Sequence, residues 1–305
     1  MLANKGFQFK QFFIEHDRCA MKVGTDSIVL GSWLQQHNLL AALSNETKLK
    51  ALDIGCGSGL LAIMLAQTLA AQIQAQVPYN HAIPTFDVLA IEPETEAAKQ
   101  ALENMRASPW QHNLRLQAAS LQDFCNQDVA EFAHGAHQTD LYSRAAAGRF
   151  DIIVANPPYF PIKDQQSMLA EGRSKEFTGH LNCVASKDAT PRVLARQQTQ
   201  LRLPLLCYYV AQLLQSNGTF YCVLPESQLA FVQQCLARND LAICRQLLIR
   251  TTPNKPPSRV CLAIVRAKLM SQFNELDEQN ITIQAEDGTY SEEFKQLCRN
   301  FYLNF

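Results

Sequence analysis

The sequence has no long apolar run and no large excess of charge of either sign. No apolar segment of the chain reaches the roughly 18 consecutive residues that a membrane-spanning helix requires. The first residues, MLANKGFQFKQFF, also lack the cationic region, apolar stretch and small-residue cleavage site of a secretory leader. We therefore expect a cytoplasmic protein without a membrane-bound segment.

The sequence also lacks closely spaced cysteine pairs. Ten cysteines are present, but none forms a CxxC motif, and most stand in apolar runs. Cysteine in such runs behaves as a small hydrophobic side chain. We expect reduced thiols, with neither a disulfide framework nor a bound metal.

The formal net charge of −1 does not indicate a nucleic-acid-binding protein, whose domains are often strongly basic. It does not exclude one, because local basic clusters can supply the phosphate contacts. Each cluster alone is more simply explained as solvated surface. The clusters are Lys5, Lys10, Arg18 and Lys22; Arg192, Arg196 and Arg202; and Arg245, Arg250, Lys255 and Arg259.

From about residue 49 the chain alternates between strand-like and helix-like segments, which predicts an α/β fold. The last two apolar runs have only PNKPPS between them and predict an antiparallel pair at one sheet edge. We expect a doubly wound, mostly parallel seven-stranded sheet with an antiparallel terminal strand. The predicted strands are 50–54, 86–92, 114–120, 150–155, 219–225, 241–252 and 258–267; the predicted helices are 60–76, 93–108, 203–218 and 226–240; and 77–85, 134–148 and 160–190 are predicted loops or insertions.

A glycine-rich loop follows the first strand, in LDIGCGSG. Gly55, Gly57 and Gly59 allow a tight turn and a close approach of the backbone to a ligand. The spacing is GxGxG rather than the GxGxxG of dinucleotide-binding loops. Asp53 precedes the loop, and a carboxylate there suits an ammonium group better than a pyrophosphate. The loop therefore favours S-adenosylmethionine over NAD.

An acidic residue ends the next strand. Glu92 follows an apolar run and precedes Pro93 and Glu94, which suit the start of a helix. A carboxylate at this strand end can accept hydrogen bonds from both ribose hydroxyls of a nucleoside. The loop and its two acids together predict a nucleoside site.

The segment NPPYF follows the apolar run FDIIVA. Pro157 and Pro158 end the strand and set the geometry of Asn156 and Tyr159. The Asn156 oxygen and a backbone carbonyl could accept from both N–H bonds of an amino group conjugated with a ring, which frees its lone pair for methylation. Tyr159 could stack on the planar group. A simple proline-bearing turn is the alternative.

With these motifs the chain resembles class I S-adenosylmethionine-dependent methyltransferases of the NPPY amino-methylating group. Within that group it is most similar to bacterial tRNA (adenine-N6)-methyltransferases that act at adenine 37 of a valine tRNA. The resemblance covers nearly the whole chain. It is carried by GFQFKQFFIEHDRCAMKVGTDSIVLGSW, LDIGCGSGLLAIMLAQ, AIEPETEAAKQALENMRASPW, FDIIVANPPYF and YSEEFKQLCRNFYLNF.

The resemblance implies methyl transfer to the N6 amino group of a tRNA adenine. It places Lys22, Gly24, Thr25 and Asp26 beside the cofactor, although Thr25 and Asp26 could instead cap a helix. It also implies a domain division into an N-terminal extension, residues 1–48, that contributes to the cofactor and RNA site, and a Rossmann-like methyltransferase domain, residues 49–305.

Two further site predictions concern the adenine of the cofactor and the RNA. Ser120 stands where the family usually carries an aspartate that contacts the adenine amino group. Arg18, Lys22 and Tyr159 are the predicted RNA contacts. The aromatic side chains near the N-terminus are expected in the core rather than stacked on bases.

Methylation of a protein glutamine amide stays open as an alternative, because it would use the same NPPY chemistry. The intact glycine loop, its two acids and the NPPY segment argue against a binding module without catalysis. An NAD-dependent oxidoreductase fails on the GxGxG spacing. We expect a monomer that takes tRNA as its partner.

Overall fold

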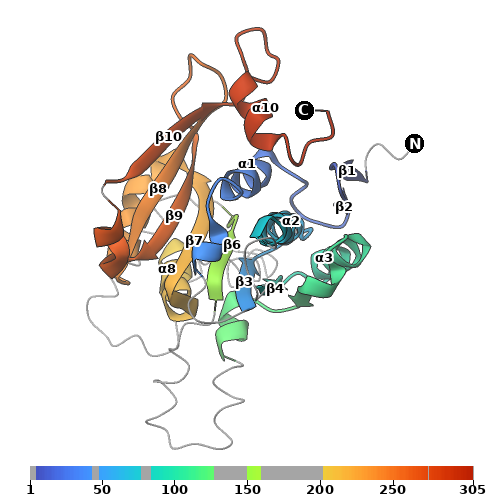
Figure 1. Ribbon diagram of the computed structural model, residues 1–305, viewed down its shortest axis with the longest axis horizontal. Coiled ribbons are helices and arrows are strands. Elements are labelled where there is room, and N and C mark those ends of the chain that lie inside the picture. The colour runs from blue at the N-terminus through green and yellow to red at the C-terminus, as the bar shows by residue number, and fades with distance from the viewer. Residues whose placement is uncertain are drawn as a thin grey trace, which may run out of the picture.

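An eight-stranded sheet forms the centre of the molecule, in the order β10-β8-β9-β7-β6-β3-β4-β5 (Figure 1). The computed structural model describes residues 5–42, 48–76, 84–126, 150–158, 202–273 and 275–304. Strand β9 runs antiparallel to both of its neighbours, and every other pair in the sheet is parallel. The strands are β3 (Lys48–Ile54), β4 (Thr85–Ile91), β5 (Leu114–Gln117), β6 (Phe150–Ala155), β7 (Leu214–Pro225), β8 (Leu241–Arg250), β9 (Arg259–Arg266) and β10 (Asp277–Thr282).

Helices cover both faces of this sheet. Strand β6 shows why, because Ile152 and Val154 join one apolar cluster while Ile153 and Ala155 join the other. Side chains of α1, α2, α3 and α10 pack in the first cluster, and those of α8 and α9 pack in the second. The helices are α1 (Thr25–Leu34), α2 (Leu60–Gln76), α3 (Thr95–Ala107), α8 (Leu203–Leu213), α9 (Leu229–Ala237) and α10 (Glu292–Cys298), with short 3₁₀ turns η1 (Leu39–Ala42), η2 (Gln111–Asn113), η3 (Glu226–Gln228) and η4 (Ala267–Gln272).

The predicted doubly wound, mostly parallel α/β fold is confirmed, but the sheet has one strand more than the seven predicted. The antiparallel pair β8 and β9 is present, yet it does not form the sheet edge, because β10 pairs in parallel with β8. The β10 sequence, DEQNIT, has a single large apolar residue, Ile281, which is also its buried one. So polar an edge strand has no apolar run by which it could be recognised.

The helix predicted over 203–218 is shorter than expected. Helix α8 ends at Leu213, and Leu214 already pairs with Phe150 of β6. Gly218 therefore lies in strand β7 and is not a helix cap, and a Cβ there would lie 2.9 Å from the Asp151 carbonyl oxygen. Pairing with the neighbouring strand has overridden the local helical pattern. Of the predicted loops, 134–148, 160–190 and 77–83 lie outside the described residues.

The N-terminal hairpin and the C-terminal tail lie side by side (Figure 1). Strands β1 (Gly6–Gln8) and β2 (Phe13–Glu15) form a two-stranded sheet, and Phe9 bridges to Tyr302. Phe9 and Phe12 are buried and stack at 4.6 Å between ring centroids, as expected for core aromatics. Apolar contacts thus hold the N-terminal hairpin against the C-terminal tail.

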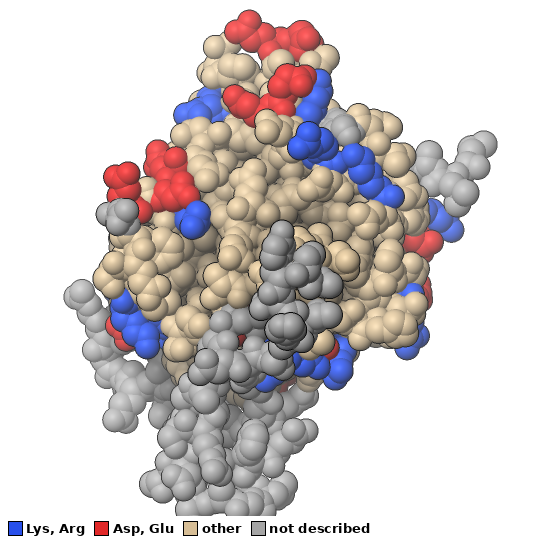
Figure 2. Space-filling model, viewed as in Figure 1, with Lys and Arg blue, Asp and Glu red and all other residues tan. Residues whose placement is uncertain are grey.

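Seven of the nine described cysteines are buried, and none of these nine is in a disulfide. Within the described ranges, no helix is long and apolar enough to cross a membrane, and no cluster of His, Cys, Asp or Glu is suited to hold a metal ion. Figure 2 shows the face seen in Figure 1. Charged side chains gather at the rim of that face, whereas its visible centre is largely uncharged.

Candidate active site

Strand register brings the three sequence motifs together at the carboxyl-terminal ends of three neighbouring strands. Ile54 at the end of β3 pairs with Ala155 of β6 on one side and with Ile91 of β4 on the other. The residues that follow these strand ends, Gly55, Asn156 and Glu92, are therefore neighbours. After β3 the strands β4 and β5 are added on one side, and β6 is then added on the other side of β3. Ligands of open α/β sheets bind at such a switch point in strand order.

The glycine loop leaves room for a ligand. Gly55, Gly57 and Gly59 have φ of 68°, 54° and 81°, a region that other residues rarely adopt. A Cβ on Gly55 or Gly57 would meet nothing within 4 Å, whereas one on Gly59 would lie 3.1 Å from the Met105 Cε atom. The first two glycines thus border open space, and the third allows α2 and α3 to pack closely.

Glu92 holds this loop in shape. Its Oε2 accepts a hydrogen bond from Gly57 N at 2.9 Å, and its Oε1 accepts one from Glu94 N at 3.0 Å. Burial raises the pKa of Glu92, and the two backbone N–H groups oppose that shift. Each oxygen retains a second lone pair for a ligand hydroxyl. Pro93 follows in an exposed position, and Glu94 is the N-cap of α3, so the helix begins at Thr95 rather than at 93 as predicted.

Asp53 lies beneath the loop and is completely buried. Its Oδ2 accepts from Ala62 N at 3.0 Å, which ties the end of β3 to the first turn of α2. Its Oδ1 has no hydrogen-bond partner among the described residues. Burial raises the pKa of Asp53 to about 7, repulsion by Glu92 adds to the rise, and the Ala62 bond opposes it. An ammonium group near the loop would compensate this carboxylate electrostatically.

Two buried amides of α3 position the N-terminal segment next to Glu92. Gln100 accepts from Arg18 N at 3.0 Å and donates to Asp17. Asn104 donates to the carbonyls of Glu15 and Ser58 at 2.8 and 2.9 Å, which joins β2 to the glycine loop. These positioning residues were missed at the sequence level, because their partners lie far away in the chain.

The charge environment of Cys19 also places this segment beside the site. Burial raises the pKa of the Cys19 thiol to about 11, and repulsion by Glu92 and Glu94 contributes. The stretch that continues through Lys22, Gly24 and Thr25 is exposed, so it is accessible to a ligand.

Thr25 and Asp26 do not cap helix α1. Gly24 occupies the N-cap position without a side-chain hydrogen bond. Asp26, one residue inside the helix, forms an ion pair with Arg259 at 3.0 Å between Oδ2 and Nε. That ion pair links the start of α1 to the first residue of β9.

The Asn156 side chain is oriented by helix α1. Its Nδ2 donates to Ser27 Oγ at 2.9 Å, which identifies Oδ1 as the end of the amide that would accept from a substrate. Ser27 was not predicted, because nothing in TDS relates it to a residue so distant in sequence. Pro157 is buried and Pro158 is exposed, while Tyr159 lies outside the described residues.

Ser120 already has a local partner. Its Oγ donates to Asp123 Oδ2 at 2.6 Å and accepts from Asp123 N at 3.1 Å. Asp123 is exposed and is thus a second acceptor available beside Ser120.

The guanidinium of Arg18 forms an ion pair with Glu103. Because this ion pair is exposed, a phosphate can compete with Glu103 for the guanidinium.

Replacing Glu92 tests its role in ligand binding. Glu92→Gln loses one of the two backbone contacts and the negative charge, and we expect S-adenosylmethionine affinity to fall at least about tenfold. Isothermal titration measures this effect. Glu94→Gln is the matched control, because it removes an exposed acid nearby but keeps an oxygen for the α3 cap. Equal affinities of the two variants would contradict the assignment.

Comparisons with known proteins identify the class. The methyltransferase small domain family matches residues 35–197, slightly more than half of the chain. Two solved structures share the fold: a predicted O-methyltransferase, Atu636, from Agrobacterium tumefaciens (TM-score 0.51, 11% identity, 90% of this chain and 96% of that one), and an S-adenosylmethionine-dependent methyltransferase from the same organism (TM-score 0.50, 13% identity, 86% and 69%). The chain is thus a methyltransferase of the S-adenosylmethionine-dependent class and has the fold of that class.

Curated relatives narrow this class. The chain is 35% identical over 317 residues to a protein of Pseudoalteromonas atlantica, 36% identical over 305 residues to one of Actinobacillus succinogenes, and 33% identical over 306 residues to one of Yersinia enterocolitica. The matches cover 100% of this chain and 100%, 100% and 95% of those proteins, each named tRNA1(Val) (adenine(37)-N6)-methyltransferase. The chain belongs to the family of these proteins.

Proposed function

We propose that the chain transfers a methyl group from S-adenosylmethionine to N6 of adenine 37 in a valine tRNA. The observation that carries the proposal is the register of β4, β3 and β6, which puts Glu92, the glycine loop and Asn156 side by side at the carboxyl-terminal ends of these strands. Full-length similarity to enzymes named for this reaction supports the choice of substrate.

The residues present fit S-adenosylmethionine. Gly55 and Gly57 offer an open backbone surface, Glu92 offers oxygens for ribose hydroxyls, and the unpartnered Asp53 Oδ1 supplies negative charge for the ammonium group. Lys22, Gly24, Thr25 and Pro93 would border the cofactor, with Ser120 near its adenine. The bound cofactor supplies an electrophilic methyl group on a sulfonium centre.

Asn156 would activate the acceptor nitrogen. The exocyclic amine of adenine is a poor nucleophile because its lone pair is delocalised into the ring. Hydrogen bonds from its two N–H groups to Asn156 Oδ1 and a backbone carbonyl set by Pro157 would localise that lone pair. Tyr159 would stack on the base. An adenine in a single-stranded loop is suited to such a site, since little unstacking is needed.

The test is a labelling experiment with two substrates. The purified protein is incubated with methyl-labelled S-adenosylmethionine and either bulk tRNA or total protein from a strain that lacks the enzyme. We expect label in tRNA as N6-methyladenosine, and fragment mapping to place it at position 37. Label confined to protein would instead favour glutamine N5-methylation, and label in neither would overturn both.

The cellular context belongs to the same proposal. We propose that the protein acts on tRNA in the cytoplasm and works as a monomer. Sedimentation at assay concentration tests the oligomeric state, and a dimer would contradict it.

A further inference from the structure

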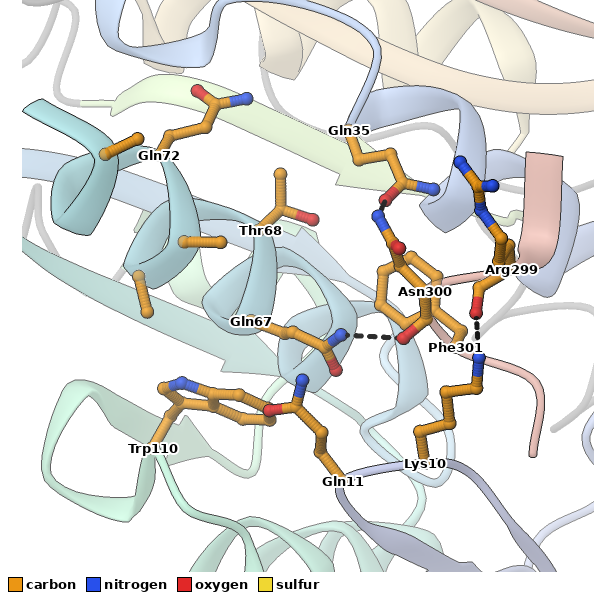
Figure 3. A pocket seen from close by; sticks show the side chains of 13 residues that line it. Lys10, Gln11, Gln35, Gln67, Thr68, Gln72, Trp110, Arg299, Asn300 and Phe301 are labelled. Carbon is orange, nitrogen blue, oxygen red and sulfur yellow. Dashed lines mark hydrogen bonds between the residues drawn. The ribbon is translucent and has the colours of Figure 1, made fainter. Parts of the chain in front are cut away.

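A groove with a mixed polar and apolar lining lies away from the candidate active site, between α2, the N-terminal hairpin and the C-terminal tail (Figure 3). Its volume is about 610 Å³, and its lining includes Lys10, Gln11, Gln67, Trp110 and Arg299. Gln67 stands eight residues after Gly59 on α2, which corresponds to roughly 12 Å along the helix axis. The groove is therefore distinct from the glycine loop but close enough for one RNA molecule to contact both.

Gln67 lines this groove and carries a buried acceptor without a partner in the described part of the chain. Its side chain is 93% buried, since its relative exposure is 7%. Its Nε2 donates to Asn300 O at 3.1 Å, which fixes the orientation of the amide (Figure 3). Its Oε1 has no partner among the described residues, and a buried acceptor in this state is unfavourable unless a ligand or water donates to it.

Trp110 and Arg299 supply the other contacts that a nucleotide needs. The half-buried indole of Trp110 forms part of the wall and is held edge-on against Phe12. Arg299 is exposed, and in the described part of the chain no carboxylate forms an ion pair with it. Lys10 Nζ donates to the Arg299 carbonyl at 2.6 Å and so fixes the backbone there (Figure 3).

We propose that this groove binds a second nucleotide of the tRNA, outside the target adenine. A base would stack on Trp110 and donate an N–H to Gln67 Oε1, and Arg299 would contact a phosphate. An aromatic plane, a fixed acceptor and a cation match base, base edge and backbone. The inference rests on tRNA being the substrate, as proposed above, and it deepens that proposal by assigning a further contact surface.

Tryptophan fluorescence of the full chain tests the stacking. The chain has two tryptophans, and Trp33 is completely buried, so a base can reach only Trp110. We expect unmodified tRNA to quench the emission saturably in the presence of S-adenosylhomocysteine. The quench should be lost in Trp110→Phe, which keeps an aromatic ring for packing. No quench in the wild type, or an undiminished quench in Trp110→Phe, would overturn the proposal.

Salt dependence of tRNA binding tests the phosphate contact. Arg299→Gln should reduce the slope of log K against log salt by about 1, with unchanged affinity for S-adenosylmethionine. The matched control is Arg238→Gln, an exposed arginine that follows α9 on the other face of the sheet. Equal slopes for the two variants would overturn the contact. If the wild type methylates tRNA but both tests fail, only the groove assignment falls; if it does not methylate tRNA, the proposed function itself falls.

Discussion

Asn156→Ala should lower the rate of methyl transfer by about 10²–10³-fold, the usual effect of removing one preorganised polar contact to a transition state. S-adenosylmethionine affinity should change little, because Glu92 and the glycine loop keep their own hydrogen bonds. Single-turnover methylation of tRNA gives the rate, and isothermal titration gives the affinity.

Two further variants separate chemistry from structure. Asn156→Asp keeps acceptor oxygens and should retain more activity than the alanine variant. Ser27→Ala removes the group that accepts from Asn156 Nδ2 and should lower the rate by a smaller factor. An equal loss of rate and cofactor affinity in Asn156→Ala would mean that Asn156 only supports the loop.

The fold could be predicted from the sequence, and a candidate site proposed, because the central strands are buried on both faces. All six residues of β6 are buried, and such a strand reads as a continuous apolar run whose end is easily recognised. Once the three strand ends were known, parallel pairing was sufficient to bring Gly55, Glu92 and Asn156 together.

What could not be predicted depends on long-range partners. Gln100 and Asn104 are polar residues on a helix with mostly exposed polar neighbours, and only the contacts to Asp17, Glu15 and Ser58 show that they are buried for a reason. The complete burial of Asp53 could not be predicted from the sequence either. Its position before the loop indicated a carboxylate suited to a nearby ammonium group, and the structure adds that this carboxylate is fully buried beneath the loop.

That burial makes the contribution of Asp53 to stability depend on pH. Its pKa is about 7 in the folded chain, against 3.8 for the ordinary side chain. Between these values the folded state holds a proton that the unfolded state has lost. Stability therefore falls as pH rises from about 4 to about 7, by up to roughly 4 kcal/mol from this group alone. The ligand-free protein at pH 8 carries a buried, incompletely paired carboxylate.

Asp53→Asn should accordingly stabilise the ligand-free protein at pH 8 and not at pH 5. The amide oxygen can still accept from Ala62 N, but its nitrogen needs a partner, so we expect a net gain of about 1–3 kcal/mol. Urea unfolding at the two pH values measures this difference. A variant that is no more stable than wild type at pH 8 would show that the carboxylate is paired or protonated there.

The same substitution should weaken S-adenosylmethionine binding, which would explain why an unfavourable charge is kept. In the wild type, affinity should rise as pH increases through about 7, because the ionised carboxylate attracts the ammonium group. Asp53→Asn should lose this rise and bind about tenfold more weakly at pH 8. Asp151→Asn is the control. Asp151 is also a buried acid, but it lies on β6 and accepts from Lys50 N, whereas Asp53 accepts from Ala62 N at the start of α2. If Asp53→Asn bound as tightly as wild type at pH 8, the charge beneath the loop would serve the fold and not the cofactor.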